Sequence, residues 1–171
     1  MTTSADVGIV LGSASDWSQV EAAALLLKDW GINCEVVVAS AHRAPRKVQA
    51  YARDAADRGV KVIIAAAGMA AHLAGVVAAE TTLPVIGVPM AGSSLQGLDS
   101  LLSTVQMPPG VPVATMAIGS AGAKNAAIFA AQILALSDPR LQERLKRHKE
   151  ELEQKVAQQA EKIPAEFRSK G

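Results

Sequence analysis

The sequence predicts an α/β fold of the flavodoxin-like type, a three-layer αβα arrangement with a five-stranded parallel sheet and a long C-terminal helix. Short apolar runs begin about every 25 residues, with amphipathic segments between them. This alternation is typical of βαβ units, which make the strands parallel and cover both faces of the sheet. Half of the residues are hydrophobic but only 3% are aromatic, which suits closely packed helices. We expect a single domain, residues 1–171, with its core at residues 7–136.

Five short runs of apolar and β-branched residues are expected to form the strands. They lie at residues 7–11, 35–39, 60–66, 84–88 and 113–117. The run Val36-Val37-Val38 has no polar residue, so it predicts a buried strand. Pro89 is expected to close the fourth strand, because proline cannot donate a backbone hydrogen bond.

Residues that can start or end a helix follow the strands. Ser15 or Asp16 can cap the first helix by accepting a free backbone N–H, and Gly31 is expected to end it. The second helix is expected from Pro45 to Gly59, because proline is tolerated in a first helical turn. Later helices are expected after the loop at residues 67–75 and at residues 98–105 and 124–136.

The last segment, residues 139–162, is expected to be an amphipathic helix rich in charged residues. Its apolar stripe, too narrow for a core element, consists of Leu141, Leu145, Leu152 and Val156. The helix can lie on its own domain or pack on a neighbouring subunit. We favour the subunit contact, because helices already cover both faces of the sheet. His148 is expected to be solvated, and residues 164–171 are expected to fray.

The composition excludes several classes of partner. A formal net charge of +1 gives no sign of binding to nucleic acid or to a membrane surface. The longest apolar run, residues 60–79, is interrupted by Lys61 and His72 and is not expected to span a membrane. The only cysteine, Cys34, suggests a reducing, cytoplasmic compartment. Neither a metal nor a signal peptide is expected, because no Cys/His spacing suits a metal and residues 1–6 are short and polar.

Polar side chains follow three of the expected strands, in loops at residues 12–16, 40–43 and 68–72. The carboxyl ends of parallel strands meet at one edge of a sheet, where open α/β proteins bind their ligands. Each loop also leads into a helix N-terminus, which suits a phosphate. His42 is the best acid–base candidate, since histidine exchanges protons near neutral pH. Arg43 can hold a phosphate or carboxylate with two parallel hydrogen bonds.

A structural interpretation of the same residues stays open. His42 and Arg43 can be solvated side chains of an ordinary strand-to-helix loop. Asp16 can be a helix cap or can receive a ribose hydroxyl. His72 can be a hydrogen-bonded structural histidine or a residue behind the ligand site. If the chain is an enzyme, catalysis needs one proton-transfer group and a preorganised phosphate site.

Five motifs, in order along the expected core, resemble a known enzyme family. They are Gly12-Ser13-x-Ser15-Asp16-Trp17, Ser40-Ala41-His42-Arg43-x-Pro45, Ala70-Ala71-His72-Leu73, Leu83-Pro84-Val85-Ile86-Gly87-Val88-Pro89 and Leu98-Asp99-Ser100-Leu101-Leu102-Ser103-x-Val105-Gln106-Met107-Pro108. In these motifs the chain is similar to class I N5-carboxyaminoimidazole ribonucleotide mutase, the bacterial-type catalytic subunit of phosphoribosylaminoimidazole carboxylase. The resemblance implies a homo-octamer with active sites at subunit boundaries, a ribonucleotide substrate and no cofactor.

The reaction that the resemblance implies moves a carboxylate from the exocyclic nitrogen N5 of an imidazole ribonucleotide to ring carbon C4. It proceeds by decarboxylation, trapping of CO₂ and recarboxylation, and His42 is implied as the general acid and base. Ser13, Asp16 and Arg43 are implied to contact the ribose and phosphate. The other residues implied at the substrate site are Gly12, Ser15, Ser40, Gly68, Met69, Ala70 and His72.

Two other functions stay open. A related class of enzymes makes the same product from aminoimidazole ribonucleotide and free CO₂, but its loop lacks the pattern Ala70-Ala71-His72-Leu73. A flavodoxin-like fold also suits a flavin- or nucleotide-binding module, although two Trp, one Tyr and two Phe offer little for flavin stacking.

The chain departs from the common family pattern at Met69, where glycine is frequent, and at residues 90–93, so the roles of these positions stay open.

Overall fold

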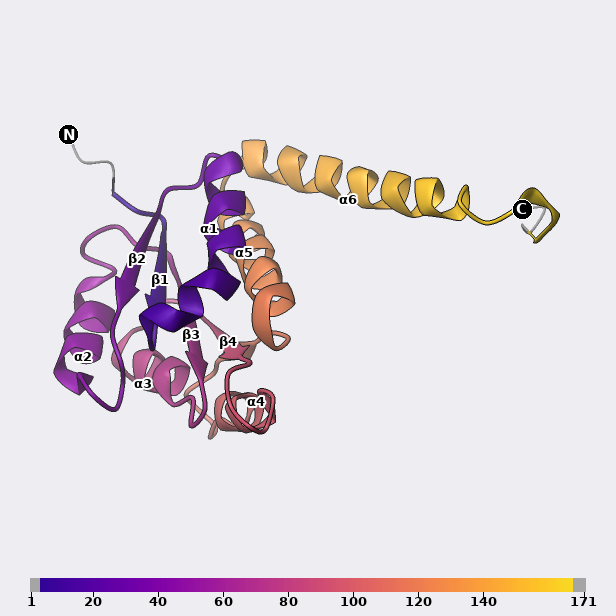
Figure 1. The fold of residues 1–171 in the computed structure, drawn as a ribbon. Coiled ribbons are helices and arrows are strands. Elements are labelled where there is room, and N and C mark those ends of the chain that lie inside the picture. Colours follow the sequence, from indigo (N-terminus) through magenta and orange to yellow (C-terminus); the bar gives the residue numbers. More distant parts are fainter. Residues whose placement is uncertain (1–3, 168–171) are drawn as a thin grey trace.

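Helices cover both faces of a five-stranded parallel sheet, and one long helix projects away from it (Figure 1). This computed structural model describes residues 4–167. The strands are β1 (Val7–Leu11), β2 (Cys34–Val38), β3 (Val62–Gly68), β4 (Val85–Met90) and β5 (Ala114–Thr115). They pair in the order β2-β1-β3-β4-β5, and every pair is parallel, which confirms the predicted flavodoxin-like arrangement.

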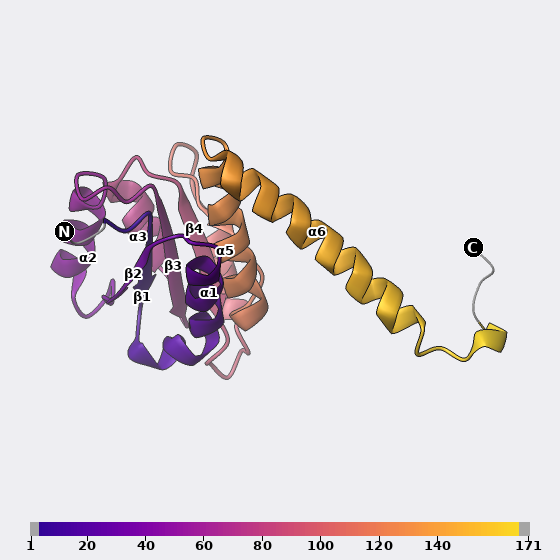
Figure 2. The ribbon, with the colours of Figure 1, turned by 90° about the horizontal axis from the view of Figure 1, so that it is seen from above.

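Two hydrophobic cores lie on opposite faces of the sheet. The helices are α1 (Trp17–Asp29), α2 (Pro45–Asp54), α3 (Leu73–Glu80), α4 (Leu98–Val105), α5 (Gly119–Ala135) and α6 (Pro139–Ala160), with 3-10 turns at Ala14–Asp16 and Ala165–Phe167. Helices α1 and α5 pack side by side on one face, where buried alanines of α5 allow a close approach. Helices α2 and α3 cover the other face. Figure 2 shows these layers from above.

Several predicted boundaries are wrong by a few residues. Helix α2 ends at Asp54 because residues 55–59 form a turn, in which Gly59 has a φ of 94°. Pro89 does not close β4, which continues to Met90. Because β5 pairs only with Ile86 and Gly87, no backbone hydrogen bond from position 89 to β5 is needed, and a proline is tolerated there. The other differences are that β2 begins at Cys34, β3 covers Val62–Gly68, β5 has two residues, α5 begins at Gly119 and α6 ends at Ala160.

The valine run of β2 is not buried as predicted. Strand β2 lies at the edge of the sheet, and Val36 and Val38 are 40% and 44% exposed. Only Val37, whose side chain alternates to the other face, packs against a buried core. A run of β-branched residues does not by itself distinguish a central strand from an edge strand, so this prediction was wrong.

Tyr51 of α2 ties the β2 edge to the sheet. Its hydroxyl donates a hydrogen bond to Glu35 Oε1 over 2.8 Å. A Cβ at Gly8 of β1 would lie 2.1 Å from that hydroxyl, so a larger residue there would displace Tyr51. Burial, together with the Glu35 carboxylate, holds the pKa of Tyr51 well above its usual range.

The substitution Tyr51→Phe is expected to lower the free energy of unfolding by about 1 kcal/mol. The ring keeps its packing, and Arg58 still pairs with Glu35 over 2.7 Å, so the change removes one partly buried hydrogen bond. Urea unfolding of the parent and the variant measures the difference. An unchanged midpoint and slope would show that this bond does not stabilise the fold.

Helix α6 lies on the core only along its first half. Leu141 is buried and Leu145 packs against the α1/α5 core, whereas Leu152 and Val156 are 41% and 66% exposed.

The prediction that His148 is simply solvated is wrong, because its ring lies 5.2 Å from the Trp30 ring in an edge-on contact. Of the segment expected to fray, residues 165–167 form a 3-10 turn and residues 168–171 lie outside the described residues.

Candidate active site

A cavity of about 530 Å³ opens at the carboxyl edge of the sheet. The loops after β1, β2, β3 and β4 line it, around the point where the strand order reverses between β1 and β3. Every site residue predicted from the sequence lies in this lining: Gly12, Ser13, Ser15, Asp16, Ser40, His42, Arg43, Gly68, Met69, Ala70 and His72. The structure therefore brings together side chains from three loops that are far apart in the sequence.

Five further residues line the cavity and were not predicted: Ala41, Ala67, Leu73, Met90 and Gly92. Met90 and Gly92 belong to the segment 90–93, whose role the sequence left open, and neither has a side chain that by itself suggests a ligand. The rule that ligands bind beyond strand ends points to this segment, because it follows the expected end of the fourth strand at Val88. The other three have apolar side chains next to predicted residues, and nothing in the sequence distinguishes them.

Asp16 and two serines fix the loop after β1. The Ser13 N–H donates to Asp16 Oδ2 over 3.1 Å, and the Ser15 hydroxyl donates to Ser13 Oγ over 2.8 Å. The prediction that Ser15 or Asp16 caps α1 is wrong, because neither side chain makes a capping hydrogen bond to that helix. Ser13 and Asp16 instead form a capping box around the 3-10 turn. Burial raises the pKa of the Asp16 carboxyl, and the Ser13 N–H partly offsets this rise.

Arg43 connects the loop after β2 to the loop after β1. Its Nη2–H donates to the Gly12 carbonyl oxygen over 3.3 Å, and its Nε–H lies 3.5 Å from Ser40 Oγ. Ser40 Oγ also accepts the backbone N–H of Arg43 over 3.3 Å. A guanidinium has five N–H donors, so Arg43 keeps donors for an anionic ligand while these bonds hold it in place.

His42 and His72 form a hydrogen-bonded pair in the cavity lining. His42 Nε2 lies 2.8 Å from His72 Nδ1, so one nitrogen donates and the other accepts. Their rings meet edge to face, with centroids 5.1 Å apart. His72 is set at the start of α3 by a tight turn, in which the N–H groups of Ala71 and His72 donate to the carbonyls of Met69 and Ala70. Both histidines are exposed in the single chain.

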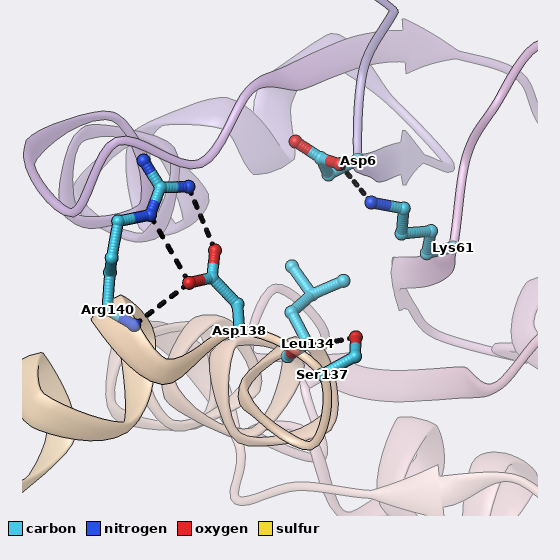
Figure 3. Close-up of polar contacts among 6 residues, drawn as sticks. All are labelled: Asp6, Lys61, Leu134, Ser137, Asp138 and Arg140. Atoms are coloured by element: carbon cyan, nitrogen blue, oxygen red, sulfur yellow. Dashed lines mark hydrogen bonds and ion pairs between the residues drawn. The ribbon is translucent and has the colours of Figure 1, made fainter.

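A second cavity, of about 670 Å³, lies at the opposite edge of the sheet, where α6 leaves the core. Two ion pairs lie in its lining (Figure 3): Lys61 with Asp6 over 2.8 Å, and Arg140 with Asp138 over 3.0 Å. Asp138 also caps α6 by accepting the Arg140 N–H over 2.9 Å. This cavity therefore lies at the joint between α6 and the core.

Residues 4–167 contain no cluster of three or more His, Cys, Asp or Glu side chains that could hold a metal ion. None of the described residues lining the carboxyl-edge cavity is Trp, Tyr or Phe. In the same described part of the chain, no helix has the length and apolar character needed to cross a membrane.

The fold is that of a flavodoxin-like α/β protein, with a cavity at the switch point of the sheet, where proteins of this fold bind their ligands. A family model described as AIR carboxylase matches residues 6–155. The chain belongs to this AIR carboxylase family, which confirms the resemblance carried by the five motifs.

Curated relatives share about half of the sequence. The N5-carboxyaminoimidazole ribonucleotide mutase of Pseudomonas aeruginosa is 57% identical over 143 residues, which cover 84% of this chain and 88% of the relative. The protein of the same name from Bacillus subtilis is 51% identical over 157 residues, covering 92% of this chain and 97% of the relative. A crystal structure of Treponema denticola PurE matches with a TM-score of 0.81 and 31% identity, covering 92% of this chain and 97% of that one.

Proposed function

We propose that this protein is an N5-carboxyaminoimidazole ribonucleotide mutase of de novo purine biosynthesis, which forms 4-carboxy-5-aminoimidazole ribonucleotide. The observation that carries the proposal is the His42–His72 pair, 2.8 Å apart, in a cavity at the carboxyl edge of the sheet. Membership of the AIR carboxylase family and the names of the relatives support it. Incubation with the N5-carboxylated substrate tests the proposal, and a failure to form the C4-carboxylated product would contradict it.

The chemistry needs one group that gives and takes a proton. Protonated His42 gives its proton to N5, which weakens the bond from N5 to the carboxylate, and cleavage of that bond releases CO₂ and the neutral aminoimidazole. Ring carbon C4, which is enamine-like, then attacks the CO₂ held in the cavity. His42 removes the proton from C4, so that the product carries the carboxylate on carbon and no atom is gained or lost overall. Holding CO₂ beside C4 replaces a bimolecular encounter, an effect worth about 7–11 kcal/mol in well-oriented systems.

His72 is proposed as a positioning residue for His42. The short Nε2–Nδ1 contact fixes the ring of His42 and couples its tautomer to that of His72. His42 Nδ1 is then the nitrogen left to face the substrate.

Ser13, Asp16 and Arg43 are proposed to bind the ribose and phosphate. Asp16 accepts the Ser13 N–H and can also accept a ribose hydroxyl. Arg43 is held by the Gly12 carbonyl and supplies a guanidinium that suits a phosphate. Ser15, Ser40, Gly68, Met69 and Ala70 are proposed to complete the pocket wall.

Direct carboxylation of aminoimidazole ribonucleotide by free CO₂ is the second candidate. The description of the family as AIR carboxylase favours it, and the same histidine pair could remove the C4 proton. The Ala70-Ala71-His72-Leu73 loop, which resembles the mutase class, supports the first candidate instead. A flavin-binding module is less well supported, because none of the described lining residues is aromatic apart from the two histidines. A flavin absorption band in the purified protein would support that module.

We further propose that the enzyme is a cytoplasmic homo-octamer, with one domain per chain and active sites at subunit boundaries. Two observations support an assembly. The projecting half of α6 leaves Leu152 and Val156 exposed, and the cavity leaves both His42 and His72 exposed although the chemistry needs water excluded. A neighbouring subunit can cover both, so α6 is proposed to help join subunits.

The double substitution Leu152→Glu with Val156→Glu is expected to break the octamer into smaller species, because it puts charge on the apolar stripe of α6. Light scattering at micromolar concentration measures the mass. The matched control is Gln154→Glu with Gln158→Glu, which adds the same charge at exposed polar positions of the same helix and is expected to leave the mass unchanged. A monomeric parent protein would contradict the proposed assembly.

A further inference from the structure

Met69 has a backbone conformation that an L-residue rarely adopts. Its φ is 59°, and in residues 4–167 the only other non-glycine residue with a positive φ is Gln96. Glycine takes this left-handed conformation without steric cost, whereas a side chain makes it unfavourable. Non-glycine residues kept in such a conformation cluster at functional sites, so Met69 deserves an explanation in terms of its side chain.

The turn that Met69 begins does not itself require methionine. Its hydrogen bonds run from the N–H groups of Ala71 and His72 to the carbonyls of Met69 and Ala70, over 2.9 and 2.8 Å. These are backbone bonds, which a glycine at position 69 could form equally well. The turn places His72 next to His42 through these backbone bonds, which do not involve the thioether side chain. A role for the side chain at position 69 is therefore sought in the cavity that it lines.

The side chain of Met69 lines the cavity and is 65% exposed. The other apolar side chains in the lining are either alanines or buried, as Leu73 and Met90 are. Met69 is therefore the long, flexible apolar side chain at the open rim. Methionine adapts its shape easily, and its sulfur makes favourable contacts with aromatic rings such as an imidazole.

We propose that Met69 closes the cavity over the imidazole of the substrate and keeps the released CO₂ inside. The inference rests on the proposed function. CO₂ is neutral and has no hydrogen-bond donor, so charged and polar residues of the cavity hold it weakly. Its retention then depends on apolar contact and on the exclusion of water, which a side chain at the rim supplies. Met69 acts on the fate of CO₂ and takes no part in proton transfer.

The test compares Met69→Gly, Met69→Leu and Gln96→Gly in the full-length protein. Each receives substrate labelled with ¹³C in its N5 carboxylate, in buffer with unlabelled bicarbonate, and the label at C4 of the product is measured. Gln96→Gly is the matched control, because it relieves the same kind of backbone conformation at a residue that does not line the cavity. Thermal unfolding checks that every variant is folded.

We expect Met69→Gly to lower the labelled fraction at C4 by about half or more, while Met69→Leu and Gln96→Gly keep the label of the parent. A Met69→Gly protein that retains as much label as the parent, or more, would overturn the proposal and leave the mutase function standing. A parent protein that does not convert the labelled substrate at all would instead overturn the proposed function, and the role of Met69 with it.

Discussion

Replacement of His42 by asparagine is expected to lower turnover by a factor of about 10² or more, while the fold and ribonucleotide binding are kept. Asparagine has a similar size and can still hydrogen-bond to His72, which lies 2.8 Å from His42 in the parent. It cannot exchange a proton at neutral pH. The loss therefore falls on the chemical step, and it is seen in kcat rather than in the affinity for substrate.

Steady-state kinetics together with calorimetric titration of the ribonucleotide separate these effects. His148→Asn is the matched control, because His148 packs on Trp30 of the α6 joint, far along the chain from the cavity lining. It is expected to turn over normally. Near-normal turnover of His42→Asn would remove His42 from the mechanism.

Removal of the Arg43 guanidinium is expected to weaken substrate binding by a factor of about 10² in Arg43→Ala, since charge-assisted hydrogen bonds to a phosphate are lost. Arg43→Lys keeps the charge but not the paired donors, so an intermediate loss of about tenfold is expected. The parent should also bind more weakly as ionic strength rises.

Arg46→Ala provides the control for Arg43, because it removes the same charge from a residue of α2 that does not line the cavity. Substrate affinities measured at two salt concentrations, for the parent and the three variants, test whether Arg43 binds the phosphate. Equal affinity of the parent and Arg43→Ala, or binding that is independent of salt in the parent, would show that Arg43 does not bind the phosphate.

The fold was predictable because apolar runs and capping residues recur with the βαβ spacing. What failed were features that depend on neighbours in space. The exposure of Val36 and Val38 follows from the edge position of β2, and the passage of β4 through Pro89 follows from the shortness of β5. The division of α6 into a packed half and a projecting half could not be read from its uniform apolar stripe either.

The polar side chains of the cavity lining were predictable from strand-end loops and from the family motifs, since these positions all belong to one edge of the sheet. The contact between His42 and His72 was not, because 30 residues and two loop conformations separate them. The left-handed backbone conformation of Met69 could not be predicted from the sequence either. The resemblance to the family showed only that Met69 stands where glycine is frequent.

Isotope labelling of the substrate tests most directly whether CO₂ leaves N5 and reaches C4 without escaping. The parent enzyme is given substrate with ¹³C in its N5 carboxylate in excess unlabelled bicarbonate, and a parallel sample receives aminoimidazole ribonucleotide with ¹³C-bicarbonate. We expect most of the label to be retained at C4 in the first sample and product to form slowly in the second, because a closed pocket gives CO₂ a high effective concentration beside C4. Loss of the label to solvent, with fast product formation from bicarbonate, would contradict the mutase assignment and establish direct carboxylation.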